Sequence, residues 1–142
     1  MHKKIYASGF LYHLPSNQIL LQQDITAQNL LSQWFLFGGT CAEKDDPEVI
    51  FKHLISDLLH IKIKTVHHVY SYENENMNNY IVYSEVEKLR DFSPKNGIIF
   101  NWFPFKNALK LQLSEQTKHD IVVGQRVIDA AGRKDRGEHT FQ

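Results

Sequence analysis

The stretch from Gly38 to Ile61, GGTCAEKDDPEVIFKHLISDLLHI, decides the interpretation of the whole chain. It follows an apolar run, Trp34–Phe37, which predicts a short buried strand that ends in a glycine turn. Asp46 is a suitable N-cap and Pro47 suits the first helical turn, so a helix should begin there. A strand, a glycine turn, an acidic loop and a helix together form a common arrangement for holding a phosphate and its metal ion.

The helix predicted after Pro47 has a broad apolar face. Its apolar residues recur three and four positions apart, which is the spacing of one side of a helix. They are Ile50, Phe51, Leu54, Ile55, Leu58 and Leu59. A helix with such a face packs against a sheet or another helix, so this segment should contribute to the core.

Length and composition limit the class of protein. The 142 residues suffice for one domain with a real core. Sixteen basic and sixteen acidic side chains cancel, so no overall field would attract nucleic acid or an anionic membrane, and neither is expected as a partner. Apolar runs are far shorter than the roughly 20 residues that span a bilayer. The single cysteine, Cys41, fits a reducing cytoplasm, which is the expected location, and its thiol is expected to be structural.

Strands account for most of the remaining pattern. Alternating apolar residues, or β-branched and aromatic content, predict strands over residues 5–13, 18–22, 61–72, 80–86 and 98–105. The first two should form a hairpin through the turn Leu14–Asn17. A short helical turn is expected at 107–111. A last helix should begin after Ser114 and end at Gly132.

This order of elements predicts an α+β fold, an α/β/α sandwich in which a mixed sheet lies between helices. The domain should span residues 1–132. Residues 133–142 contain five charges and one apolar side chain, which predicts a disordered tail.

The same residues resemble the Nudix hydrolase (MutT-like) family, whose box is GX5EX7REUXEEXGU, where U is a bulky aliphatic residue. Aligned without gaps, the box covers Gly39–Ile61, and its first aliphatic place falls on Ile55. The family often precedes the box with Trp-x-x-Pro-Gly-Gly, and Trp34–Gly39 matches that segment in part. The resemblance covers about residues 3 to 131. It implies a Nudix-type mixed β-sheet flanked by helices.

The box is degenerate where the family has its chemistry. The family's Arg-Glu pair becomes His53 and Leu54, and its Glu-Glu pair becomes Asp57 and Leu58. In the family these glutamates bind divalent cations and help to activate water. The resemblance therefore implies Mg²⁺ or Mn²⁺ at the Gly39 carbonyl and Asp57, with Asp57 as the catalytic residue. The substrate-binding residues stay unassigned.

Alternatives to this alignment remain open. Shifting the helix by one residue puts Lys52 and His53 on the Arg and Glu places, but this requires a deletion and spoils the fit at Ile61. Asp57 is either a metal ligand or a solvated charge, and His53 is either a base or a surface histidine. His67 and His68 should point to opposite faces of their strand.

Other residues could complete a site, although each alone is more typical of a surface or core position. The acids that could add metal ligands are Glu43, Asp45, Glu48, Glu73, Glu75, Glu85 and Glu87. The aromatic residues that could stack a base or ribose are Tyr6, Phe10, Trp34, Tyr72, Tyr80, Trp102 and Phe103.

Two classes of function follow. The first is a divergent, metal-dependent pyrophosphohydrolase acting on a nucleoside diphosphate linked to another moiety. The second is a catalytically inactive Nudix-fold module that binds a nucleotide or a protein, since two of the three metal-binding Glu places are Leu54 and Leu58. Whether the protein is an enzyme stays open at this point. Dimers are common among Nudix proteins, so the resemblance also allows a homodimer.

Overall fold

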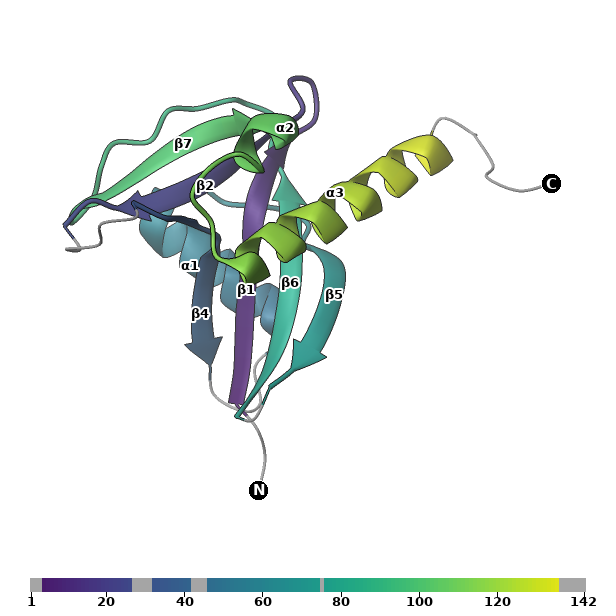
Figure 1. Ribbon diagram of the computed structural model, residues 1–142, viewed down its shortest axis with the longest axis horizontal. Helices are drawn as coiled ribbons and strands as arrows, with labels where there is room; N and C mark the ends of the chain where they lie inside the picture. Colours follow the sequence, from purple (N-terminus) through teal and green to yellow (C-terminus); the bar gives the residue numbers. More distant parts are fainter. Residues whose placement is uncertain (1–3, 27–31, 42–45, 75, 136–142) are drawn as a thin grey trace.

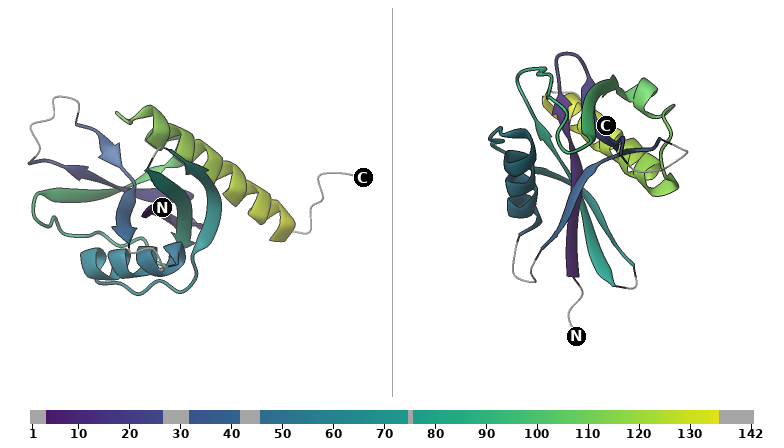
Figure 2. Two further views of the ribbon diagram at one scale, coloured as in Figure 1. Left: turned by 90° about the horizontal axis from the view of Figure 1, so that it is seen from below. Right: turned by 90° about the vertical axis from the view of Figure 1, so that its left-hand side faces the viewer.

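One mixed sheet lies between two helices in the computed structural model, which describes residues 4–26, 32–41, 46–74 and 76–135 (Figure 1). The strands are β1 (Lys4–His13), β2 (Gln18–Asp24), β3 (Trp34–Phe35), β4 (Phe37–Cys41), β5 (His67–Glu73), β6 (Met77–Glu85) and β7 (Ile98–Pro104). The helices are α1 (Pro47–Leu59), α2 (Phe105–Ala108) and α3 (Glu115–Asp135). Helix α1 covers one face of the sheet and α3 crosses the other (Figure 2). The predicted α+β class is confirmed.

Strand β1 is the centre of the sheet. It runs parallel to β6 along one edge, from the pair Lys4 and Met77 to the pair Tyr12 and Glu85. Its other edge pairs antiparallel with β4 in its first half and with β2 in its second half. Strand β2 continues to β3 and β7, and β5 pairs with β6. Because β1 pairs with β6 on one edge and with β4 and β2 on the other, it connects the parts of the sheet to one another.

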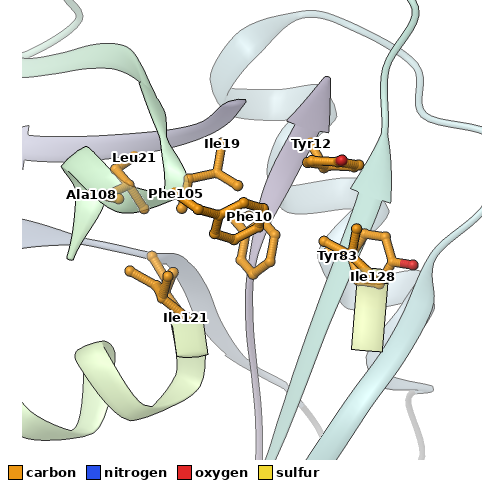
Figure 3. Packing of buried hydrophobic residues seen from close by; sticks show 10 residues of the cluster. Phe10, Tyr12, Ile19, Leu21, Tyr83, Phe105, Ala108, Ile121 and Ile128 are labelled. Atoms are coloured by element: carbon orange, nitrogen blue, oxygen red, sulfur yellow. The ribbon is translucent and has the colours of Figure 1, made fainter. Parts of the chain in front are cut away.

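Alternation along β1 divides the core into two clusters. Phe10 and Tyr12 belong to the cluster on the α3 side, whose members Figure 3 shows, and Leu11 belongs to the cluster on the α1 side. The α3-side cluster contains Phe10, Tyr12, Ile19, Leu21, Leu36, Tyr83, Phe105, Ala108, Ile121 and Ile128. The α1-side cluster contains Leu11, Leu20, Phe37, Phe51, Ile55, Leu59, Ile63, Val66, Val82 and Trp102.

Helix α1 begins and ends as its residues predict. The Asp46 carboxylate accepts a hydrogen bond from the backbone N–H of Glu48 at 2.9 Å, and Pro47 occupies the first turn. The helix ends at His60, whose φ of 57° is left-handed. The predicted turn Leu14–Asn17 is also confirmed, with Asn17 at a φ of 55°.

Several predictions of element bounds are wrong. Strand β6 begins at Met77 and not at Tyr80, and the helical turn expected at 107–111 is α2 at Phe105–Ala108. Gly38 and Gly39 do not make a turn, because they lie inside β4 and pair with Ser8 and Ala7. Residues 61–66 precede the strand: Ile63 and Val66 are buried, but the ladder of β5 begins only at His67. Helix α3 continues past Gly132 to Asp135, since a single glycine costs a helix only about 1 kcal/mol and basic residues favour its last turn.

Some predictions concern residues outside the described ranges. These residues are Glu43, Asp45, Glu75 and the tail after Asp135, and the side chain of Cys41 is likewise not described. Within the described ranges, none of the helices combines the length and apolar character that a membrane crossing requires.

Candidate functional site

The face of α1 that the box predicts to be chemical is apolar. Leu54 and Leu58, four residues apart, are half-buried and pack against the α1-side core cluster. Phe92 and Phe100 pack against the same cluster, and the Phe100 ring stacks on Phe37 with centroids 6.1 Å apart. Two of the places where the family has metal-binding carboxylates therefore belong to the hydrophobic core here.

Asp57 lies on the solvent side of α1 and is exposed. Its carbonyl oxygen accepts a hydrogen bond from the ammonium group of Lys95 at 3.1 Å. That contact brings the connection between β6 and β7 against the helix. His53 is exposed as well, one turn earlier. Neither side chain has a hydrogen-bond partner among the described residues, so neither is held in a fixed catalytic orientation by them.

The two glycines of β4 have different surroundings. A Cβ placed on Gly38 would lie 2.8 Å from Cζ of Tyr6, and closer still to the Tyr6 hydroxyl oxygen. A Cβ on Gly39 would meet nothing within 4 Å among the described residues. Gly38 is therefore required by the packing of Tyr6, whereas Gly39 borders open space on the α1 side.

The described residues do not provide the ligands that Mg²⁺ or Mn²⁺ prefers. In the ranges that the structure describes, no group of three or more His, Cys, Asp or Glu side chains comes close enough to hold a metal ion. Glu48 is exposed in the first turn of α1, and Glu85 and Glu87 border a hollow beyond the other end of that helix. Hard divalent cations take several oxygen ligands. The described residues therefore do not fit a Nudix metal site.

The α3 side of the sheet carries a buried polar group instead. Asp120 is only 4% exposed. The Tyr70 hydroxyl donates to its carboxylate at 2.5 Å, and the Gln116 amide donates to the same oxygen at 2.8 Å. The Gln116 amide also lies 3.0 Å from the Tyr70 hydroxyl. These three side chains connect the N-terminal half of α3 to β5.

Burial raises the pKa of Asp120, and the hydrogen bonds from Tyr70 and Gln116 oppose that shift. Burial, the hydrogen bond to Asp120 and its charge raise the pKa of the Tyr70 hydroxyl. Burial also raises the pKa of Tyr72, with smaller contributions from Asp120 and Tyr6. The cluster therefore keeps its phenols protonated and able to donate hydrogen bonds throughout the physiological range.

Asn79 lies next to this cluster with an unused donor. It is 6% exposed on β6, where it pairs with Tyr6 on one side and Tyr72 on the other. Its side-chain nitrogen is buried and has no hydrogen-bond partner among the described residues. A buried amide without a partner costs roughly 1–3 kcal/mol, so such a group is rare without a purpose. We call Tyr6, Asn79 and Tyr72 the tyrosine–asparagine row.

The row lies where helix α3 leaves the sheet uncovered. Alternation puts Asn79 on the same face as Tyr83, and Tyr6 on the same face as Phe10, which is the α3 side. Figure 1 shows that α3 crosses the middle of β1, β6 and β5, while the lower ends of these strands extend beyond it. Tyr6 and Tyr72 are half-buried there, whereas the Asn79 side-chain nitrogen is buried.

The remaining predicted side chains are mostly structural. Phe10 and Trp102 are core residues, Trp34 packs on Phe103 with centroids 4.9 Å apart, and Tyr80 lies near His68. His67 stacks on Tyr83 of the α3-side cluster, with ring centroids 4.9 Å apart. His68 lies beside Tyr80 on the other face, so the predicted divergence of the two histidines is confirmed.

Sequence reasoning missed Asn79, Gln116 and Asp120. A signal existed for Asp120, since it interrupts the apolar stripe of α3 directly before Ile121. Asn79 likewise occupies a strand position whose alternate neighbours, Ile81 and Tyr83, are buried. A polar residue at an inward position is a candidate for function as well as for structure.

Comparison with solved structures decides the fold. A mutT/nudix family protein from Listeria innocua superposes with a TM-score of 0.74 over 92% of this chain and 97% of its own, at 14% identity. The chain has a Nudix fold. The NUDIX domain of Shewanella oneidensis NrtR, solved with ADP ribose, gives a TM-score of 0.69 at 12% identity over 90% of each chain. MutT in a study of Aliivibrio salmonicida and Vibrio cholerae gives 0.66 at 12% identity, over 88% of this chain and 96% of that one.

The likeness lies in the structure and not in the sequence. No protein-family model matches the chain, and no curated protein matches its sequence at a significant level. The predicted Nudix fold is thus confirmed at identities of 12–17% among the compared structures. A fold survives such divergence when the pattern of buried positions is kept.

Proposed function

We propose that this Nudix-fold protein binds a nucleoside diphosphate derivative, with ADP-ribose as the first ligand to test, and does not hydrolyse it. The observation that carries the proposal is the packing of Leu54 and Leu58 into the α1-side core. Converting carboxylates to core leucines removes the metal ligands and stabilises the fold through burial. This exchange disfavours metal-dependent hydrolysis, whereas a binding protein needs no metal ligands at these positions.

The tyrosine–asparagine row supplies the recognition. The buried Asn79 amide offers a donor to a ring nitrogen or carbonyl oxygen of a base, and a buried donor discriminates strongly because its alternative is to stay unpaired. Tyr6 and Tyr72 flank it, and aromatic side chains stack on bases without needing a metal. The NrtR domain, which has the same fold, was solved with ADP ribose.

The test is a calorimetric titration of ADP-ribose into the wild-type protein and into two variants. Asn79→Ala should weaken binding by about tenfold or more, since one good hydrogen bond to a buried group is worth roughly 1.5 kcal/mol. Asn78→Ala is the matched control, because alternation directs this neighbouring side chain to the other face of β6. Its affinity should equal that of the wild type.

Stability separates function from structure in the same variants. Asn79→Ala removes an unpaired donor, so its free energy of unfolding should equal or exceed that of the wild type. If Asn79 served only the fold, Asn79→Ala would lower the free energy of unfolding. Absence of ADP-ribose binding by the wild-type protein, or equal affinity of wild type and Asn79→Ala, would overturn the ligand proposal.

The alternative function is metal-dependent hydrolysis by the divergent box. It would use Asp57 and the Gly39 carbonyl as metal ligands, completed by acids elsewhere in the chain. Incubation with Mg²⁺ or Mn²⁺ and a panel of nucleoside diphosphate derivatives tests it through the release of a nucleotide. Metal-dependent turnover that disappears in Asp57→Ala would favour this alternative over the binding protein.

A further inference from the structure

A separate hollow lies beyond the C-terminal end of α1. It has a volume of about 480 Å³ and lies between two connections, residues 60–64 and residues 85–92. Asn79 and Glu85 are at opposite ends of β6, which puts about 20 Å between the hollow and the tyrosine–asparagine row at the usual rise of a strand. The hollow is therefore distinct from the site proposed above.

Both walls of the hollow follow the same pattern. On the first, Ile61 and Ile63 pack into the α1-side core, which leaves the intervening Lys62 and the following Lys64 exposed. On the second, Val86 and Phe92 pack against the same core. The cations Lys88 and Arg90 lie between them and are exposed. Apolar residues therefore form the base of the hollow, and four basic side chains form its rim.

The walls are held by buried hydrogen bonds. The Trp102 indole donates to the carbonyl oxygen of Arg90 at 2.7 Å, and the Ser84 hydroxyl donates to the carbonyl oxygen of Thr65 at 2.6 Å. Trp102 and Ser84 are both buried. The backbone beneath two of the charged stretches is thus fixed to the sheet, which gives the cations a defined spacing.

Positive charge exceeds negative charge in this hollow. Lys62, Lys64, Lys88 and Arg90 line it together with only two carboxylates, Glu85 and Glu87. In the part of the chain that the structure describes, no ion pair joins any of these cations to a carboxylate. The chain as a whole has a net charge of zero, so this excess is local. Concave clusters of one charge sign attract and concentrate the opposite sign.

We propose that this hollow binds the phosphate groups of a small phosphorylated molecule. Guanidinium groups bind phosphate oxygens in pairs and lysines add point charges, so the rim has the chemistry that phosphate recognition uses. A volume of about 480 Å³ is within the usual range of small-molecule sites. A nucleic acid fits less well, because it needs a long basic track, and Glu85 and Glu87 border this hollow.

Inorganic pyrophosphate and triphosphate are the probes for this site. We expect saturable binding at constant ionic strength, measured by calorimetry and by chemical-shift changes in residues 60–64 and 85–92. Lys62→Gln with Arg90→Gln should weaken this binding by about tenfold or more, since each substitution removes a charge-assisted hydrogen bond to phosphate. Comparing the affinity of ADP with that of pyrophosphate shows whether the phosphates alone are recognised. Binding of either ligand in this hollow supports the proposal.

The control variant removes two positive charges at a different place on the protein. Lys106→Gln with Lys110→Gln changes two exposed lysines at α2 and should leave pyrophosphate affinity unchanged. Asn79→Ala should also leave it unchanged, so this proposal and the ligand proposal above can fail separately. Equal weakening by the control pair, no saturation at about 1 mM probe, or saturable binding of a single-stranded oligonucleotide in place of pyrophosphate would overturn the proposal.

Discussion

The two faces of the sheet differ in the polarity of their buried and half-buried side chains. On the α1 face, positions that the Nudix box reserves for carboxylates are filled by Leu54 and Leu58, and both pack on the core. On the α3 face, the buried carboxylate of Asp120 and the unpaired amide of Asn79 occupy positions that leucine or valine could fill. Apolar side chains therefore occupy the aligned box positions on the α1 face, and polar groups are buried on the α3 face, where we propose that a ligand is recognised.

We propose on this basis that catalysis and recognition are separable within one fold. The backbone of α1 and β4 needs only the hydrophobic pattern and the helix cap, both of which survive without carboxylates. Recognition needs a few polar groups in an apolar surface, which cost stability and persist only when they are used. Four predictions follow from treating the two faces in this way, in order of decreasing effect.

The largest effect should come from the buried face of α1. Phe51→Ala removes a fully buried ring and should lower the free energy of unfolding by about 3–5 kcal/mol. Val49→Ala, on the exposed side of the same helix, should change it by less than about 0.5 kcal/mol. Denaturant unfolding measures both, and a similar cost for the two variants would contradict the orientation of α1.

Restoring a carboxylate on that face should be costly. Leu58→Glu buries part of a charge against the α1-side core and should cost roughly 2 kcal/mol, and Mg²⁺ should not recover it. Leu89→Glu, at an exposed position, is the control and should be near neutral. A melting temperature of Leu58→Glu that rises with Mg²⁺ would reveal an incipient metal site and weaken the comparison of the two faces.

A smaller effect should distinguish the two glycines of β4. Gly38→Ala forces the Tyr6 side chain to move, at a cost of about 1 kcal/mol, the low end for overpacking because Tyr6 is only half-buried and can turn. Gly39→Ala enters open space and should be neutral or slightly stabilising. Thermal unfolding compares them, and the reverse order would show that Gly39 is the constrained position.

The smallest effect should be a change in pH dependence. Because burial raises the pKa of Asp120, the folded protein holds this proton more tightly than the unfolded chain. Its contribution to stability is full at or below the ordinary carboxyl pKa and falls as the pH rises through the raised value. Asp120→Asn should therefore match the wild type near pH 4 and gain stability relative to it towards about pH 7. A difference that stays constant with pH would contradict this assignment.

Local signals predicted the fold well, because its elements are set by neighbouring residues. The Asp46 cap, the Leu14–Asn17 turn and the apolar stripe of α1 each depend on residues within one or two turns. The end of α1 is also a local feature, since His60 adopts a left-handed φ of 57° directly after the last helical residue.

Long-range contacts explain what the sequence left undecided. Tyr70 and Asp120 are separated by 50 positions, and Tyr6 reaches the row only because β1 runs parallel to β6. The sequence around Gly38 and Gly39 is typical of a turn, but the pairing of β4 with β1 keeps the backbone extended through both glycines. The box alignment can be made from the sequence alone, whereas the tyrosine–asparagine row follows only from the register of three strands.

The most direct test of the account is the metal dependence of ligand binding. ADP-ribose is titrated into the wild-type protein with Mg²⁺ and again with a chelator, and the same samples are analysed by chromatography for released AMP. We predict dissociation constants that agree within about twofold, a difference below roughly 0.5 kcal/mol, and no AMP in either sample. Metal-dependent release of AMP, lost in Asp57→Ala, would contradict the claim that this Nudix fold binds without hydrolysing.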